Sequence, residues 1–327
     1  MMLFKKRMSV TRFRFVEKTD LSEKEVLKNL SAYSFDAEAP LSQKEISGFT
    51  TVSDPYEGRD FIETEVLHGS YAVAVFRRDS RSVASSAVKR EVEKEIAQFM
   101  QKTGAKGIIR GLKNDIKERV TFDLLTQTPF RTELIPFVLD INSGVGYFFS
   151  VGSSAYSSFE DIFSRSMGLS IEIIDFGEGD FLSWLWWRLE TNEMNQPEGA
   201  EITAGTKFSI GNNDGKALSG SASDAEMRLA VANGGDIRKM MIQPIGGDEF
   251  LVDVYGRLSG VKINKEELPS EESSSLLPLI ARIEESFFVV DKWMAEYRKN
   301  PKNISDFYAS KTEWALPTIC RAAFEDI

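Results

Sequence analysis

The stretch LIPFVLDINSGVGYFFSVGSSAYSSFEDIFSRSMG, residues 134–168, predicts the layering of the fold. Two apolar runs, LIPFVLDI and YFFSV, flank the turn residues NSGVG, a pattern typical of a β-hairpin. SSFEDIFSRSMG then has helical spacing and ends on Gly168, which can terminate a helix. The same order of strand, strand and helix precedes it at 61–67, 71–77 and 85–104. This repetition indicates an α+β fold with antiparallel sheets rather than a doubly wound parallel sheet.

The helix of the first unit, SSAVKREVEKEIAQFMQKTG at 85–104, is strongly charged. Ser85 or Ser86 can cap its start and Gly104 can end it. Its apolar positions recur at helical spacing and predict a buried face made of Val88, Val92, Ile96 and Phe99 or Met100. Arg90 and Lys94 share another face, where the neighbouring glutamates weaken the positive field.

The next segment, KGIIRGLKNDIKER at 106–119, has five basic side chains in fourteen residues. On a helix, its basic residues gather within an arc of roughly 60° and form one stripe, made of Lys106, Arg110, Lys113 and Lys117. The buried face beside it comprises Leu112, Ile116 and Val120. Because Gly107 and Gly111 each cost about 1 kcal/mol inside a helix, the helix can begin later than Lys106.

Outside these segments the chain continues to alternate strands and helices. A strand is predicted at 8–16, a helix with a capping box at Asp20 and Glu23, and a loop at 48–58. Beyond SIEIIDF and the aromatic helix GEGDFLSWLWWRLE, we expect a strand near 201–210, a helix near 223–233, the hairpin IRKMMIQPI with DEFLVDVYGRLSGVKI, and a long helix at 274–298. Polar stretches favour loops at 191–200 and 211–223.

We therefore predict three parts: an N-terminal α+β region at 1–175, a C-terminal α+β region at 176–300 with a finger-like loop near 211–223, and a C-terminal tail at 301–327. Weak patterning leaves the structure of the tail open.

The distribution of charge is uneven in a chain with a net charge of −10 and a pI near 5.0. Residues 1–20 carry a net charge of +4 and residues 81–119 a net charge of +5, which leaves −19 for the rest. Such segregation favours one anion-binding surface on an acidic exterior. A solvated helix face is the plainer reading of the same stripe.

Composition excludes several classes of protein. The single cysteine, Cys320, rules out an internal disulfide and a cysteine-based zinc site, and we expect it to be a packed side chain. No long apolar stretch follows the basic N-terminus, and FLSWLWW at 181–187 is too short to cross a bilayer. The expectation is a soluble cytoplasmic protein.

The chain offers little material for catalysis. His68 is the only histidine, which leaves histidine triads and multi-histidine metal sites without ligands, and we expect it at the surface of a turn. No phosphate-binding loop of the GxxxxGK[ST] type occurs, so no cofactor is expected. Asp175, Glu178 and Asp180 follow a strand and could bind Mg²⁺ in a nuclease. Three tryptophans, Trp184, Trp186 and Trp187, suit core or interface packing, and base stacking is the alternative.

The order of these segments resembles the RdgC family of recombination-associated proteins. The resemblance rests on collinearity over about residues 2–175. It is carried by MLFKK, LSEKEVLKNL, GFTTVSDPYEG, SRSVASSAVKREVEKEIAQF, LKNDIKERVTFDLLTQTPFR, LIPFVLDINSGVGYFFSV and SMGLS. FLSWLWWRLE is similar to a form found in some members, and GDEFLVDVYGRLSGVKI resembles the C-terminal part of the family more loosely.

This resemblance implies a horseshoe-like protomer of several subdomains that closes head to head into a ring-shaped homodimer. Double-stranded DNA would pass through a positively charged hole, without sequence preference, and RecA recombinase would have limited access to it. The implied DNA contacts are Arg90, Lys94, Lys106, Arg110, Lys113, Lys117 and Lys216, and the implied dimer contacts are Phe130 and Arg131. We expect a non-enzymatic, nucleoid-associated protein. An Mg²⁺-dependent nuclease and a protein-interaction module that uses the surface of Trp184–Trp187 are the alternatives.

Overall fold

The computed structural model describes most of the chain. The described residues are 3–18, 21–36, 43–57, 61–176, 180–191, 196–211, 217–221, 235–268, 276–299 and 307. Helices and strands alternate along the chain, and the strand pairs are antiparallel, which confirms the α+β class. Within the described residues no helix is both long and apolar enough to cross a membrane.

The elements follow one another in a fixed order along the chain. The N-terminal ones are β1 (Arg7–Phe15), α1 (Glu23–Ala32), β2 (Glu45–Thr50), α2 (Glu63–Val66), β3 (Leu67–His68), β4 (Tyr71–Ser80), α3 (Ser85–Thr103), α4 (Arg110–Gln127), β5 (Arg131–Asp140), β6 (Val145–Phe148), α5 (Ser153–Met167) and β7 (Ile171–Ile173). The C-terminal ones are α6 (Phe181–Thr191), β8 (Ile202–Gly211), β9 (Ala217–Ser221), β10 (Asp236–Pro244), β11 (Phe250–Asp253), β12 (Leu258–Lys262), the 3₁₀ turn η1 (Lys265–Glu267) and α8 (Leu277–Lys299).

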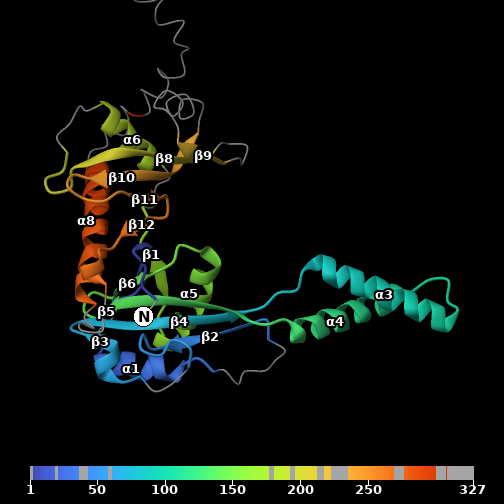
Figure 1. The fold of residues 1–327 in the computed structure, drawn as a ribbon. Helices are drawn as coiled ribbons and strands as arrows, with labels where there is room; N and C mark the ends of the chain where they lie inside the picture. The colour runs from blue at the N-terminus through green and yellow to red at the C-terminus, as the bar shows by residue number, and fades with distance from the viewer. Residues whose placement is uncertain are drawn as a thin grey trace, which may run out of the picture.

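The strands form two sheets that share β1. The N-terminal sheet runs β2-β4-β5-β6-β1, with β3 beside β4 and β7 beside β1, and the C-terminal sheet runs β1-β12-β11-β10-β8-β9. Residues 7–10 of β1 pair with β12, whereas residues 11–15 pair with β6 and β7. A register shift between Met8 and Ser9 lies within the stretch that pairs with β12. One strand therefore ties the start of the chain to both sheets (Figure 1).

An aromatic core fills one face of the N-terminal sheet, where α1 and α5 cover it. Phe159 of α5 lies at 4.5 Å from the ring centroid of Phe148 and at 5.2 Å from that of Phe137. Phe13 of β1 packs against the same helix, and its ring is completely buried. Burying large aromatic side chains supplies much of the hydrophobic free energy of a core, so this cluster holds α5 on the sheet.

The opposite face of the same sheet is also buried, because α8 lies along it. Val73, Val75 and Val138 belong to a second core that includes Phe287 and Val290 of α8. Strands covered on both faces carry continuous apolar runs rather than an alternating pattern, and YAVAVF of β4 and LIPFVL of β5 are such runs.

α8 extends past the N-terminal sheet and covers the C-terminal sheet as well (Figure 1). On its N-terminal-sheet side, Asp291 forms a bidentate ion pair with Arg12 at 2.6 Å, and Glu284 accepts a hydrogen bond of 2.9 Å from the Tyr71 hydroxyl. Burial, with the neighbouring Glu284, raises the pKa of Tyr71 to about 12. On the other side, the Trp293 indole donates to the carbonyl of Ala200 at 2.8 Å. One helix thus fastens the two sheets together.

The expected order of elements is largely confirmed. Gly104 and Gly168 end α3 and α5 in left-handed conformations with φ of 69° at both, as the sequence predicted. Strands at 8–16, 134–141 and 201–210 and a helix at 274–298 are present within a few residues, and the aromatic segment predicted to be helical at 177–190 is helical from Phe181. The helix expected near 223–233 lies outside the described residues, as does the tail except Phe307. The division of the chain at residue 175 stays a prediction.

Five local expectations are wrong. The loop expected near 211–223 contains strand β9, because residues 217–221 pair with β8. The segment 48–58 begins as strand β2, and 63–66 forms helix α2, so the first strand of the expected hairpin shrinks to β3. The capping box of α1 uses Ser22 and Glu25, because these side chains complete the reciprocal pair of hydrogen bonds. α3 begins after Ala84 without a side-chain cap, so neither serine caps it.

Candidate nucleic-acid interface

Helices α3 and α4 form an arm that projects from the N-terminal sheet (Figure 1). The arm is inserted between β4 and β5, which pair directly where it leaves them, since Ser80 lies opposite Arg131. A long antiparallel pair of strands therefore supports the arm at its root. The helices pack against each other and are otherwise open to solvent along most of their surface.

A small core of its own holds the arm together. Val88 and Val92 of α3 face Ile116 and Val120 of α4, and all four are at most 9% exposed. Ile96 and Leu112 pack beside them and remain partly exposed. The spacing of these apolar residues predicted this face, and a two-helix layer leaves every other face to solvent.

The arm carries six of the seven candidate DNA contacts. Arg90 and Lys94 lie on α3, and Arg110, Lys113 and Lys117 lie on α4; all are exposed. Lys106 is also exposed but lies in the connection before α4, because the helix begins at Arg110. The basic stripe on the helix is therefore shorter than the spacing alone implied, and Lys106 extends it from the loop. The seventh candidate, Lys216, lies outside the described residues.

Ion pairs distinguish the cations of the arm from one another. Lys94 is paired with Glu91 at 2.8 Å, Lys89 lies 3.9 Å from Glu93, and Arg119 of α4 is paired with Glu95 of α3. Within the described part of the chain, no carboxylate lies within ion-pair distance of the five remaining candidate DNA contacts, which are Arg90, Lys106, Arg110, Lys113 and Lys117. These five charges are available to an anionic partner.

The root of the arm is organised around Arg81, which the sequence did not single out. Its guanidinium lies 4.4 Å above the ring of Phe130, and its Nε donates to the carbonyl of Gln43 at 3.1 Å. Phe130 is half-buried by this contact, while the side chain of Arg131 is 82% exposed and 3.6 Å from Glu133. The predicted role of Phe130 and Arg131 in a dimer stays a prediction.

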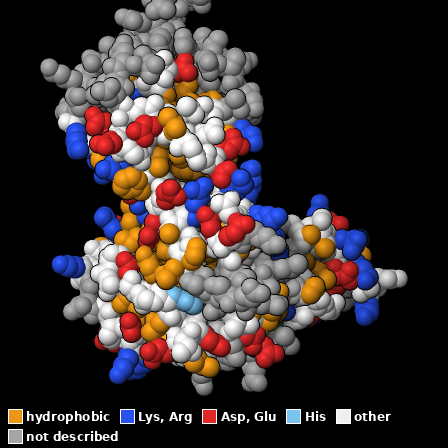
Figure 2. Space-filling view, turned by 60° about the vertical axis from the view of Figure 1, so that its left-hand side comes forward, with side chains coloured by type: hydrophobic (Ala, Val, Ile, Leu, Met, Phe, Trp, Pro, Cys, Tyr) orange, Lys and Arg blue, Asp and Glu red, His pale blue; other side chains and the backbone are white. Residues whose placement is uncertain are grey.

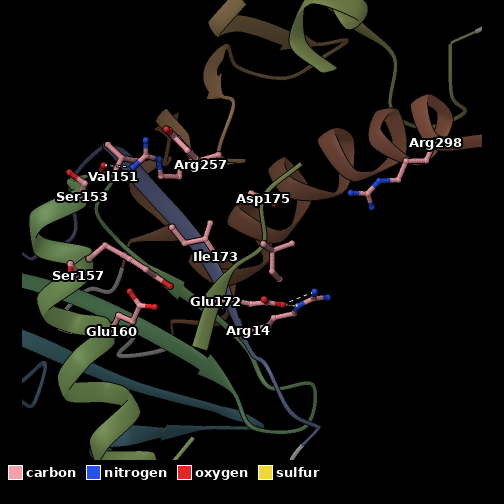
Figure 3. Close-up of a pocket in the computed structure, with 13 residues that line it drawn as sticks. Arg14, Val151, Ser153, Ser157, Glu160, Glu172, Ile173, Asp175, Arg257 and Arg298 are labelled. Atoms are coloured by element: carbon pink, nitrogen blue, oxygen red, sulfur yellow. Dashed lines mark hydrogen bonds and ion pairs between the residues drawn. The ribbon is translucent and has the colours of Figure 1, made fainter. Parts of the chain in front are cut away.

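A second feature is an open cavity of about 900 Å³ where the two sheets meet (Figure 3). Ser153, Ser157 and Glu160 reach it from α5, Arg257 from the β11–β12 turn and Arg298 from the end of α8. Across from α5, Arg14 and Glu172 form an ion pair at 2.7 Å. Positive and negative side chains are mixed here, so the cavity is less suited to a polyanion than the arm is.

The carboxylates of the nuclease hypothesis are only partly placed. Asp175 is exposed in the wall of this cavity, whereas Asp180 is half-buried at the start of α6 and does not line it. Glu178 falls on residues that are not described. Among the residues that are, no three side chains of the metal-binding types gather closely enough to hold an ion.

The tryptophans belong to the core. Trp184 and Trp186 are completely buried and Trp187 is 4% exposed, where they pack with α8 and the C-terminal sheet. Core packing is thus confirmed, and base stacking and a protein-binding surface built on these rings are ruled out by their burial.

His68 lies at the hairpin, as predicted, but it is half-buried, and this burial lowers its pKa. It is visible at the surface of the N-terminal half in Figure 2.

The family model described as "Putative exonuclease, RdgC" matches residues 2–169, which include the arm and nearly all of the N-terminal sheet. No curated protein matches the chain.

Proposed function

Because the chain belongs to the RdgC family, we propose that it is a recombination-associated protein that binds double-stranded DNA without sequence preference. The observation that supports this proposal is the arm, where five of the candidate DNA contacts are exposed and have no carboxylate partner among the described residues. Lysine and arginine contacts to phosphates position a protein on DNA and carry no sequence information.

The distribution of charge supports the same proposal. A net charge of −10 would repel a polyanion from most of the surface. Concentrating unpaired cations on one projecting element overcomes that repulsion locally, and it directs the DNA to the arm. The acidic remainder of the chain then limits how much of the protein the DNA can cover.

We further propose that two copies close into a ring around the duplex, that this limits access of RecA recombinase, and that the protein acts in the cytoplasm at the nucleoid. Phe130 and Arg131 are the proposed dimer contacts, and Lys216 is a proposed additional DNA contact. A closed ring would retain DNA topologically, so few strong contacts would suffice.

The experiment that tests the proposal is a titration of a random-sequence duplex at salt concentrations from about 50 to 200 mM. Several phosphate contacts would make the logarithm of affinity fall linearly with the logarithm of salt. Two unrelated sequences should bind equally. Absence of binding at the lowest salt would reject the proposal.

We propose that the protein is not an enzyme, and exonuclease activity is the alternative. The description of the family as an exonuclease and the carboxylates Glu172 and Asp175 at the junction cavity favour that alternative. Incubating end-labelled DNA with the purified protein and Mg²⁺ or Mn²⁺ separates the two. Degradation that is abolished in Asp175→Asn would establish the nuclease, and intact DNA would support a binding protein.

A further inference from the structure

The root of the arm carries a groove at the end of the basic stripe. We call it the arm-root groove. It has a volume of about 390 Å³ and lies between α4 and the segment before β2; its walls include Lys44, Asn114, Lys117, Glu118, Thr121 and Phe122. Leu125 forms a buried part of its floor.

The basic stripe leads directly into this groove. Residues three and four apart lie on one face of a helix, so Asn114 and Thr121 are neighbours of Lys117 on the surface of α4. Lys117 therefore belongs to the stripe and to the groove at once. A strand of DNA that follows Arg110, Lys113 and Lys117 along the helix reaches the groove next.

Lys44 forms the wall of the groove opposite α4, and Arg81 holds this wall in place. The backbone N–H of Arg81 donates to the carbonyl of Lys44 at 2.9 Å, and the guanidinium of Arg81 holds the preceding carbonyl of Gln43. Lys44 is exposed and, within the described residues, has no carboxylate in ion-pair distance. Two lysines, Lys44 and Lys117, thus line one opening.

Phe122 gives the groove an aromatic surface. Its side chain is 50% exposed, and other residues form the face of α4 that packs against α3. Phe288 of α8 has a similar exposure of 47%, but there the ammonium of Lys292 lies 5.1 Å above the ring. For Phe122 no ring or cation contact is found among the described residues, so its face is free to stack.

We propose that the arm-root groove binds an unpaired DNA nucleotide. Lys44 and Lys117 hold the phosphates, the base stacks on Phe122, and Asn114 forms hydrogen bonds with the edge of the base. Glu118 repels phosphate but can accept from an exocyclic amino group of the base. Bases in an intact duplex are stacked on each other and cannot offer a face to Phe122, whereas single strands can.

This inference rests on the proposed function, because Lys117 serves both. It predicts that stacking on Phe122 adds to the affinity for a single strand, beyond the affinity that the phosphate contacts provide. Duplex DNA uses the stripe alone, and a single strand uses the stripe and the aromatic surface.

The test compares Phe122→Ala with Phe288→Ala, a matched control of the same residue type and exposure on another helix. Fluorescence anisotropy measures affinity for a labelled single strand of about 15 nucleotides and for the corresponding duplex. We expect Phe122→Ala to weaken single-strand binding about tenfold and to leave duplex binding within about twofold, because stacking acts on unpaired bases only. Phe288→Ala should change neither, and Phe122→Trp should retain single-strand binding even if the alanine variant folds poorly.

A second readout is photocrosslinking of a single strand that carries 5-iodouracil, followed by mass spectrometry. A crosslink at Phe122 supports the groove. The inference would be overturned if the two alanine variants had equal effects on single-strand affinity. It would also be overturned if Phe122→Ala changed the monomer–dimer equilibrium in sedimentation instead of single-strand affinity. Either result would leave the proposed duplex binding standing. Loss of all DNA binding by the unmodified protein would overturn both.

Discussion

The double substitution Lys113→Ala/Lys117→Ala tests the DNA-binding arm most directly. Both side chains are exposed and without carboxylate partners among the described residues, and both lie inside α4. Alanine is a better helix former than lysine, so the fold should be unaffected. Any loss of affinity can then be assigned to the two charges.

The magnitude follows from counterion release. If the five unpaired candidate contacts of the arm all bind phosphates, the slope of log affinity against log salt is about −4.5, and affinity falls about 500-fold between 50 and 200 mM salt. Removing two contacts reduces the slope to about −2.7 and the fall to about 40-fold. If the variant and the unmodified protein bind equally at 1 M salt, the variant binds about 60-fold more weakly than the unmodified protein at about 100 mM salt.

The assay is fluorescence anisotropy with a random-sequence duplex at four or more salt concentrations. Lys24→Ala/Lys28→Ala is the matched control, because these lysines are also exposed and have the same spacing on α1. The control should keep the slope of the unmodified protein. An unchanged slope in the arm variant, with thermal unfolding as in the unmodified protein, would refute the assignment of these two lysines.

Three further predictions concern the fold. Gly146→Ala should destabilise the protein by about 1–3 kcal/mol in chemical unfolding, because a Cβ there would lie 2.1 Å from Cζ of the buried Phe13 ring. Gly111→Ala, with open space around it, should be neutral or slightly stabilising. Equal effects of the two substitutions would contradict this packing. Trp184→Ala should cost about 3–5 kcal/mol, since the ring is completely buried, and a loss below about 1 kcal/mol would show that it is not in the core. Burial lowers the pKa of His68 from its ordinary value of 6.5, so His68 of the unfolded chain takes up a proton first as pH falls. The contribution of neutral His68 to stability is therefore complete above about pH 6.5 and is lost below it. The thermal unfolding temperature of His68→Asn should depend less on pH between about 7.5 and 5.5 than that of the unmodified protein.

Much of the local structure could be predicted from patterns of neighbouring residues. Gly104 and Gly168 mark the ends of α3 and α5 because their left-handed conformations are costly for other residues. The apolar spacing from Val88 to Val120 located the interface of the arm helices. The prediction failed at 63–66, where a short helix replaces a strand, since brief apolar segments have no decisive period.

The sequence by itself determined that Arg110, Lys113 and Lys117 share one face, because helix geometry places residues three and four apart on one side, but it wrongly added Lys106 to the helix. Only the tertiary structure decided that the stripe lies on an arm projecting from the body, that Lys94 is neutralised by Glu91, and that Phe122 and Lys44 meet at the root. It also decided that β1 joins both sheets and that the tryptophans are buried. The physical reason is that exposure, ion pairing and the meeting of distant segments depend on long-range packing, and local spacing contains no information about which surface a neighbouring element will cover.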